Sequence, residues 1–285
     1  MTRFLKSLFV IALFEVIFVR GAEPFTRFFW SLGFPATVLG VSTYGFAAAV
    51  LTLITCLLFR FAMRRPFSQY GVSKTSTETW TLGLASLGLL FPIALLGRIA
   101  DPGFDDIYAR YAGLLTLDGV GLFALTLPFF LFREELFLRF TQAEISKAIG
   151  RWSAILLLAV NFSLLHYPFA FPRHAAAVLV SVFFGSVILN LLFARTQNIW
   201  VTLVVHVLYD LVITVQIYFH ASGQARSEWI LWILYGIFFL FFLRRGLSLF
   251  HPGRPEEKNT EQGTPAILLL GAVMIVLPIL LLFVF

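Results

Sequence analysis

The stretch AAAVLVSVFFGSVILNLLFA, from Ala175 to Ala194, contains no charged side chain and is long enough as a helix to cross a lipid bilayer. A bilayer core of roughly 30 Å needs about 20 apolar residues in helical form. The stretch is typical of the chain, in which 59% of the 285 residues are hydrophobic and only 13% are charged. A soluble domain of this length could not bury so much apolar surface. The composition therefore excludes a soluble enzyme, a nucleic-acid-binding module and a disordered protein.

Nine windows of the sequence are candidate membrane spans. They are about Leu5–Val19, Pro35–Phe59, Trp80–Gly97, Tyr111–Phe132, Trp152–His166, Ala175–Ala194, Ile199–Phe219, Trp229–Phe242 and Pro265–Phe285. Because unpaired backbone groups cannot face lipid, we predict an all-α, polytopic transmembrane helix bundle with about 8–9 spans. Arg3 and Lys6 give the first window the basic start of a signal peptide. No small-x-small cleavage site follows it, so we expect a retained helix.

The chain shows no internal repeat and no long linker, so residues 1–285 are predicted to form a single integral membrane domain. The polar stretch His251–Thr264 precedes the last apolar window. Residues 251–285 are therefore expected to be a hinge followed by a C-terminal helix. Cys56 is the only cysteine, which excludes an intramolecular disulfide and a cysteine cluster for a metal.

The loop charges predict the orientation, because cytoplasmic loops carry an excess of Lys and Arg. One set of alternate segments holds most of the 21 basic residues: Arg3, Lys6, Arg60, Arg64, Arg65, Lys74, Arg133, Arg139, Lys147, Arg151, Arg195, Arg244, Arg245, Arg254 and Lys258. The other set holds Arg20, Arg27, Arg98, Arg110, Arg173 and Arg226. The bias remains when Arg133 and Arg139 are left out. We expect a multi-pass protein of the cytoplasmic (inner) membrane with the N-terminus in the cytoplasm, the C-terminus outside, and Asp101, Asp105 and Asp106 in an outer loop.

Ionisable residues inside membrane spans are energetically costly and usually functional. The first cluster is Arg133-Glu134-Glu135-Leu136-Phe137-Leu138-Arg139, which directly follows an apolar run. Glu135 and Arg139 are four residues apart, so they share a helix face and can pair. Glu134 lies about 100° further round the helix and can face a cavity. The alternative interpretation is an interfacial charge cluster where the helix leaves the bilayer.

Two further clusters carry histidines. His166 ends the window that contains Phe162, and His206 lies four residues before Asp210 on an otherwise apolar helix. Taken separately, His166 also fits a snorkelling histidine, and His206 with Asp210 also fits a structural His–Asp pair. Together, the three clusters indicate a polar cavity. A glutamate can draw a proton from water, and a histidine can hold that water or donate to an oxyanion. These groups are suited to hydrolysing an amide inside a membrane.

The same residues carry a family resemblance. Glu134-Glu135-x-x-x-Arg139, Phe162-x-x-x-His166 and His206-x-x-x-Asp210 resemble, in order and spacing, the three motifs of the CAAX prenyl protease and bacteriocin-processing family. These are glutamic intramembrane proteases. The resemblance covers a core of about residues 115–219, and Tyr70-Gly71-Val72 resembles a short turn that often precedes this core.

The resemblance implies a role for each motif residue. Glu134 would activate the water, His166 would position it, and His206 and Asp210 match the residues that stabilise the oxyanion. Glu135 and Arg139 would support the site by pairing. Two departures stand out: the sequence after the glutamates, Leu-Phe-Leu-Arg-Phe, is bulkier than usual, and Asp210 replaces asparagine. Because an ionised aspartate cannot donate a hydrogen bond, we expect Asp210 to orient His206.

These observations favour an intramembrane endopeptidase that needs no cofactor. We expect its substrate to be a membrane-associated protein or peptide. Its other partner is expected to be the lipid bilayer, and no nucleic acid is expected to bind. One alternative is a metal-dependent hydrolase, since the same glutamates, histidines and aspartate could bind zinc or iron. No His-Glu-x-x-His helix is present. The other alternative is a non-enzymatic transporter or immunity protein, although no related halves are visible.

Three smaller expectations follow from the predicted spans. Asn161 and Asn190 should make hydrogen bonds between helices. His174 and His220, at loop edges, should be solvated. Counting along the windows also places Glu134 in the cytoplasmic half of the membrane and His166 in the outer half, which is difficult to combine with a shared site.

Overall fold

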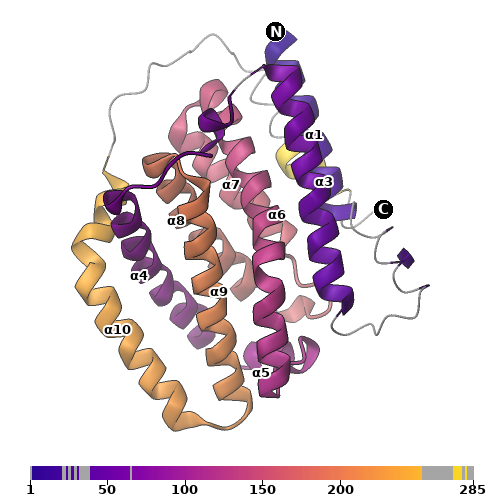
Figure 1. The fold of residues 1–285 in the computed structure, drawn as a ribbon. Helices are drawn as coiled ribbons and strands as arrows, with labels where there is room; N and C mark the ends of the chain where they lie inside the picture. The colour runs from indigo at the N-terminus through magenta and orange to yellow at the C-terminus, as the bar shows by residue number, and fades with distance from the viewer. Residues whose placement is uncertain are drawn as a thin grey trace.

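The computed structural model describes residues 2–20, 39–64, 66–251 and 272–277, and residues 24, 27, 28, 31 and 280 individually. Figure 1 shows a bundle of helices. The α-helices are α1 (Thr2–Arg20), α3 (Leu39–Met63), α4 (Thr77–Ala100), α5 (Phe104–Tyr111), α6 (Leu117–Ile149), α7 (Arg151–Leu165), α8 (Ala175–Thr196), α9 (Ile199–Ala221) and α10 (Ala225–Leu247). Shorter turns are η1 (Phe67–Tyr70), η2 (Pro172–His174), η3 (Ser248–Phe250) and the π-helical η4 (Ala272–Val276). Since none of these residues forms a strand, the prediction of an all-α bundle is confirmed.

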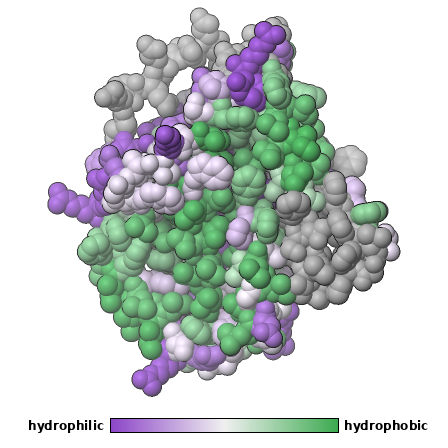
Figure 2. Space-filling view, viewed as in Figure 1, coloured by the Kyte–Doolittle hydropathy of each residue, from purple (hydrophilic) through white to green (hydrophobic). Residues whose placement is uncertain are grey.

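Where the structure describes them, the apolar windows correspond to helices, except that Tyr111–Phe132 includes the turn between α5 and α6 and Trp152–His166 ends one residue beyond α7. Four segments are long and apolar enough to cross a membrane: Thr77–Ala100, Pro172–Thr196, Ile199–Ala221 and Ala225–Phe250. Hydrophobic side chains cover much of the bundle's visible side (Figure 2), as expected of a membrane protein. The ninth window, Pro265–Phe285, lies mostly outside the described residues, as does the predicted hinge. The total number of spans and the boundaries of the core at 115 and 219 remain predictions.

Helix α6 is much longer than its apolar window. The Thr116 side chain caps its first turn by accepting from the Gly119 backbone N–H at 3.1 Å, and the helix continues for 33 residues to Ile149. Every residue from Arg133 to Arg139 is buried within the bundle. The helix neither ends at this segment nor exposes its charges to solvent, whereas its depth in the membrane stays a prediction.

A tight turn at Gly150 connects α6 to α7. Gly150 has a positive φ of 82° and joins the two helices without any further residue. Glu134 and His166 lie equally far along the chain from Gly150, one on each helix. The two residues therefore reach the same depth, and the apparent conflict between their predicted halves of the membrane disappears. The conflict arose because α6 was assumed to end near Phe132.

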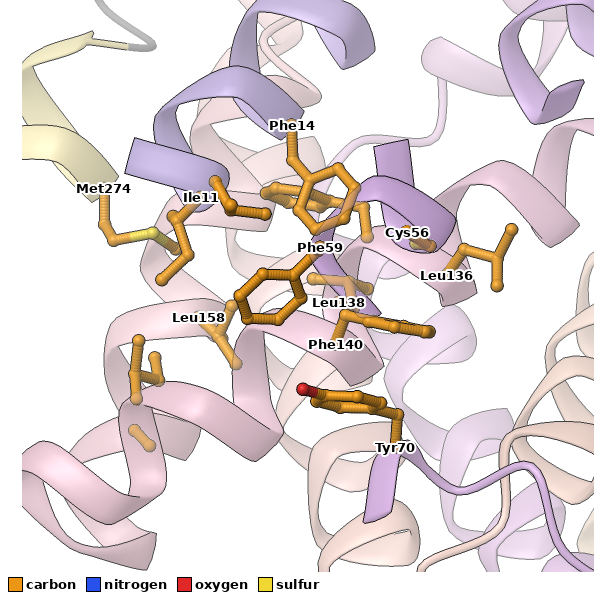
Figure 3. Close-up of a cluster of buried hydrophobic side chains, with 14 of the residues drawn as sticks. Ile11, Phe14, Cys56, Phe59, Tyr70, Leu136, Leu138, Phe140, Leu158 and Met274 are labelled. Carbon is orange, nitrogen blue, oxygen red and sulfur yellow. The ribbon is translucent and has the colours of Figure 1, made fainter. Parts of the chain in front are cut away.

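The end of the bundle near η1 is filled by aromatic packing. The buried Tyr70 ring stacks on Phe140 of α6 with ring centroids 4.5 Å apart, and Phe59 of α3 lies against Tyr70 (Figure 3). The next residue, Gly71, adopts a left-handed conformation with φ 85°, and its carbonyl accepts from the Ile199 N–H at the start of α9. The Tyr70-Gly71-Val72 turn thus fixes α9 relative to α6.

Helix α5 lies at the opposite end of the bundle, as Figure 1 shows. It was not predicted, because its eight residues include three charged side chains and are too few to span a bilayer. Ala109 of α5 is fully buried in a small apolar cluster with Leu114, Val120 of α6 and Ile217 of α9. This cluster holds α5 across the ends of α6 and α9.

Candidate active site

Helices α6, α7 and α9 bring the three motifs to one cavity of about 400 Å³. Glu134, His166, His206 and Asp210 all line it. The remaining walls come from α4, α5 and α8, mainly through apolar side chains. The residues that the sequence predicted to converge on a polar cavity are therefore adjacent in the structure.

Glu134 and His166 face each other across a short gap. Glu134 is 7% exposed, and its Oε1 lies 4.0 Å from His166 Nε2. This distance is too long for a direct hydrogen bond but allows one water molecule to contact both atoms. His166 Nδ1 lies 2.9 Å from the Phe162 carbonyl oxygen, which can only accept, so Nδ1 carries the proton. In a neutral imidazole, Nε2 is then a hydrogen-bond acceptor aimed at Glu134.

Glu135 occupies a different environment from its neighbour. It is fully buried and accepts from Arg139 Nε at 2.8 Å, the pair that the four-residue spacing predicts. Its other oxygen, Oε1, lies 3.0 Å from His206 Nδ1. Asp210 Oδ2 is 4.0 Å from His206 Nε2, beyond hydrogen-bonding distance. Glu135, rather than the expected Asp210, is thus the carboxylate that fixes the His206 ring in this structure.

Arg139 is the centre of a buried polar network below the cavity. Its side chain is fully buried, and its Nη1 donates to Gln142 Oε1 and Asn190 Oδ1, each at 2.8 Å. Asn190 of α8 in turn donates to the Ile155 carbonyl of α7 at 3.3 Å. These hydrogen bonds link α6, α7 and α8. Asn190 therefore makes the interhelical bonds expected of it, and Asn161 does so by donating to Glu15 of α1 at 2.7 Å.

Sequence reasoning assigned no role to three residues at or beside the cavity. Arg133 Nη2 lies 3.5 Å from Glu134 Oε1, and the aromatic residues Tyr108 of α5 and Tyr209 of α9 line the walls. Burial raises the pKa of the Tyr108 phenol, and the negative charges of Asp210 and Glu134 add to this effect. The phenol therefore remains a hydrogen-bond donor at neutral pH. Only Arg133 could have been found from its place beside the motif.

The expectation that His174 is solvated is wrong, and His220 is partly exposed but bonded to its neighbours. His174 is 8% exposed, and its Nδ1 lies 2.6 Å from Asp101 Oδ2. His220 contacts Arg98 and lies 3.3 Å from Glu228. Both histidines belong to a polar group at the α5 end of the bundle, made up of Arg98, Asp101, Asp105, Asp106, His174, Gln216, His220 and Glu228. Burial raises the pKa of Asp105 in this group, although the Gln216 hydrogen bond and the Arg98 charge oppose the shift.

Comparison with known proteins supports the family resemblance. Residues 116–212 match the sequence model of the type II CAAX prenyl endopeptidase Rce1-like family. A search of curated proteins and a search of solved structures gave no match. The matched segment runs from the cap of α6 to the middle of α9 and contains all three motifs. The motifs thus correctly predicted a resemblance of this segment to the CAAX prenyl protease family, whose members are proteases, and the four long apolar helices fit a membrane protein.

Proposed function

We propose that this protein is an intramembrane endopeptidase in which Glu134 activates the hydrolytic water. The observation that carries the proposal is the pairing of Glu134 Oε1 and His166 Nε2 across 4.0 Å in a buried cavity that His206 and Asp210 also line. A water between them donates one proton to each acceptor, which points an oxygen lone pair into the cavity. The direct test is cleavage of tagged membrane proteins encoded beside this gene by the purified chain.

The proposed reaction needs only protein side chains and water. Glu134 takes a proton from the water as its oxygen bonds to the scissile carbonyl carbon, and the carbonyl electron pair moves to oxygen. His206, held by Glu135, is placed to stabilise the resulting oxyanion. Collapse of this intermediate breaks the carbon–nitrogen bond, and Glu134 returns its proton to the departing nitrogen. The products are a carboxylic acid and an amine.

Substitutions of Asp210 test how the oxyanion is stabilised. Asparagine can accept a hydrogen bond through its amide oxygen and can also donate one without an added proton. Asp210→Asn should therefore keep substantial cleavage activity, whereas Asp210→Leu should lose most of it, as measured by initial rates on the same substrate. An Asp210→Asn chain that is folded yet inactive, and that excess zinc restores, would show that the Asp210 carboxylate serves as a metal ligand and would refute the metal-free reaction.

The second candidate is a metal-dependent hydrolase that uses the same carboxylates and histidines. Within the ranges that the structure describes, no three such side chains come close enough to hold a metal ion. A glutamate-activated water needs no metal, so cleavage in detergent should continue after exhaustive chelation. Elemental analysis should find less than about one metal per chain, the minimum for a metal-bound nucleophile. Recovery of activity only on adding zinc would favour the metalloenzyme.

We further propose that the chain lies in the cytoplasmic membrane with its N-terminus in the cytoplasm. The proposal rests on the distribution of Lys and Arg between alternate connecting segments. It makes the η1 end of the bundle cytoplasmic and the α5 end external. The substrate is proposed to be a protein or peptide attached to the same membrane, because the cavity lies within the helix bundle.

A further inference from the structure

The cavity is asymmetric along the bundle. Its lining from α6 runs from Phe123 to Glu134, which is the half of that helix nearer α5. Its lining from α8, Ser181 to Leu189, lies around the middle of that helix, and its lining from α9, His206 to Asp210, lies just before the middle of α9. Tyr108 of α5 completes the wall at this end. No described residue of α1, α3 or α10 lines the cavity.

The other end of the bundle is closed below the catalytic groups. Arg139 is fully buried one turn beyond Glu135, where it fills the space between α6 and α8 through Gln142 and Asn190. Beyond this network, Phe140 and Tyr70 stack with no exposed surface on Tyr70. A polypeptide coming from the η1 end would have to displace both layers.

A second cavity lies between the first and the α5 end and shares part of its wall. It measures about 170 Å³ and shares Ser181, Val182 and Tyr209 with the catalytic cavity. Its far side is lined by polar members of the group at that end, namely Arg98, Asp101, Asp105 and Gln216. Polar side chains therefore continue from the surface of the bundle to the wall beside Tyr209, whereas the opposite end is apolar or sealed by bonded groups.

From this geometry we infer that water and substrate reach Glu134 from the α5 end of the bundle, which is the external side in the proposed orientation. The inference rests on the proposed function and narrows its substrate class. The scissile bond lies in the external or outer-leaflet portion of a membrane-attached polypeptide, such as an exported peptide, rather than in a tail displayed in the cytoplasm. The polar group around Arg98 supplies the aqueous end of the path.

Cysteine labelling tests the path without relying on cleavage. Cys56 is buried and is removed as Cys56→Ala. Single cysteines are then placed in the shared wall (Ser181→Cys), on exposed α5 (Asp106→Cys) and at the exposed end of α10 (Arg244→Cys). The buried Ser86, which lines neither cavity, gives the matched control Ser86→Cys. A membrane-impermeant maleimide is applied to intact cells and to inside-out vesicles.

In intact cells, the maleimide should label Ser181→Cys and Asp106→Cys. In inside-out vesicles, it should label Arg244→Cys. Ser86→Cys should remain unlabelled in both preparations. Labelling of Ser181→Cys only from the side that reaches Arg244→Cys would overturn the inferred path. A complete lack of labelling at Ser181→Cys would do the same, because no water would then reach the wall. Labelling of Asp106→Cys only in inside-out vesicles would overturn the external assignment.

The substrate class has its own test. New protein N-termini are compared between membranes of cells that express the wild-type chain and cells that express Glu134→Gln. Glu134-dependent N-termini should map to external or outer-leaflet segments, and a set that maps to cytoplasmic tails would contradict the inference. If no N-terminus depends on Glu134, the proposed protease activity fails, while the labelling result still decides the path.

Discussion

Glu134→Gln is expected to abolish cleavage while leaving the amount of folded protein unchanged. Glutamine has nearly the same size but cannot take a proton from water, and removal of a general base typically lowers the rate about 10²–10⁴-fold. The measurement is the initial rate of cleavage of a tagged membrane substrate by purified chains. A fully active Glu134→Gln chain would exclude the glutamic mechanism and leave the metal-dependent and non-enzymatic alternatives.

Glu144→Gln is the matched control for this change. Glu144 lies on the same helix and is similarly buried at 6% exposure, but it bonds Lys147 at 2.9 Å and Ser7 at 3.1 Å, away from the cavity. Its substitution should leave the cleavage rate within the range of the wild-type chain. Equal losses from both substitutions would show that a buried carboxylate on α6 matters for folding rather than for proton transfer.

Arg139→Leu should produce the largest loss of stability. It leaves Glu135 buried without its arginine partner and removes the donor that ties Gln142 and Asn190 together. Breaking a buried ion pair from one side costs about 3–5 kcal/mol. Thermal unfolding in detergent should therefore shift downward by roughly 10 °C, at a few degrees per kcal/mol for a chain of this size.

An exposed pair of the same chemistry provides the control for Arg139. Arg245 lies 3.3 Å from Glu78, and both side chains are largely exposed to solvent. Because exposed pairs contribute about 0–1 kcal/mol, Arg245→Leu should shift the transition by only a few degrees. Similar shifts for the two leucine variants would contradict the role of Arg139 as the centre of the buried network.

The helices were predictable from the sequence because lipid imposes long apolar runs. Local spacing also predicted the Glu135–Arg139 pair, since a helix places residues four apart on one face. Spacing could not give the contact from Glu135 to His206, because it depends on how α6 and α9 pack. Asp210 was expected to orient His206 because the two residues are four apart on one helix, whereas the contact with Glu135 comes from a different helix.

Helix ends and short polar helices were the least predictable elements. The charged segment from Arg133 onward resembled a helix end, yet packing against α8 and α9 allows α6 to continue to Ile149. Helix α5 was not predicted because eight residues with adjacent aspartates carry no membrane signal. Its Tyr108 was missed as a cavity residue for the same reason. Buried partners on distant helices likewise hid the environments of His174 and His220.

The buried charges of α6 also bear on how the protein is made. A charged side chain at the centre of a membrane helix opposes insertion by about 2.5–3.5 kcal/mol, and α6 carries four of them between Arg133 and Arg139. Asn190 and His206, which bond Arg139 and Glu135, are synthesised only later, on α8 and α9. A growing chain cannot stably release α6 into lipid until those helices emerge from the ribosome. We therefore expect α6, α8 and α9 to insert together, with the hydrolytic groups assembled only when all three helices are in place.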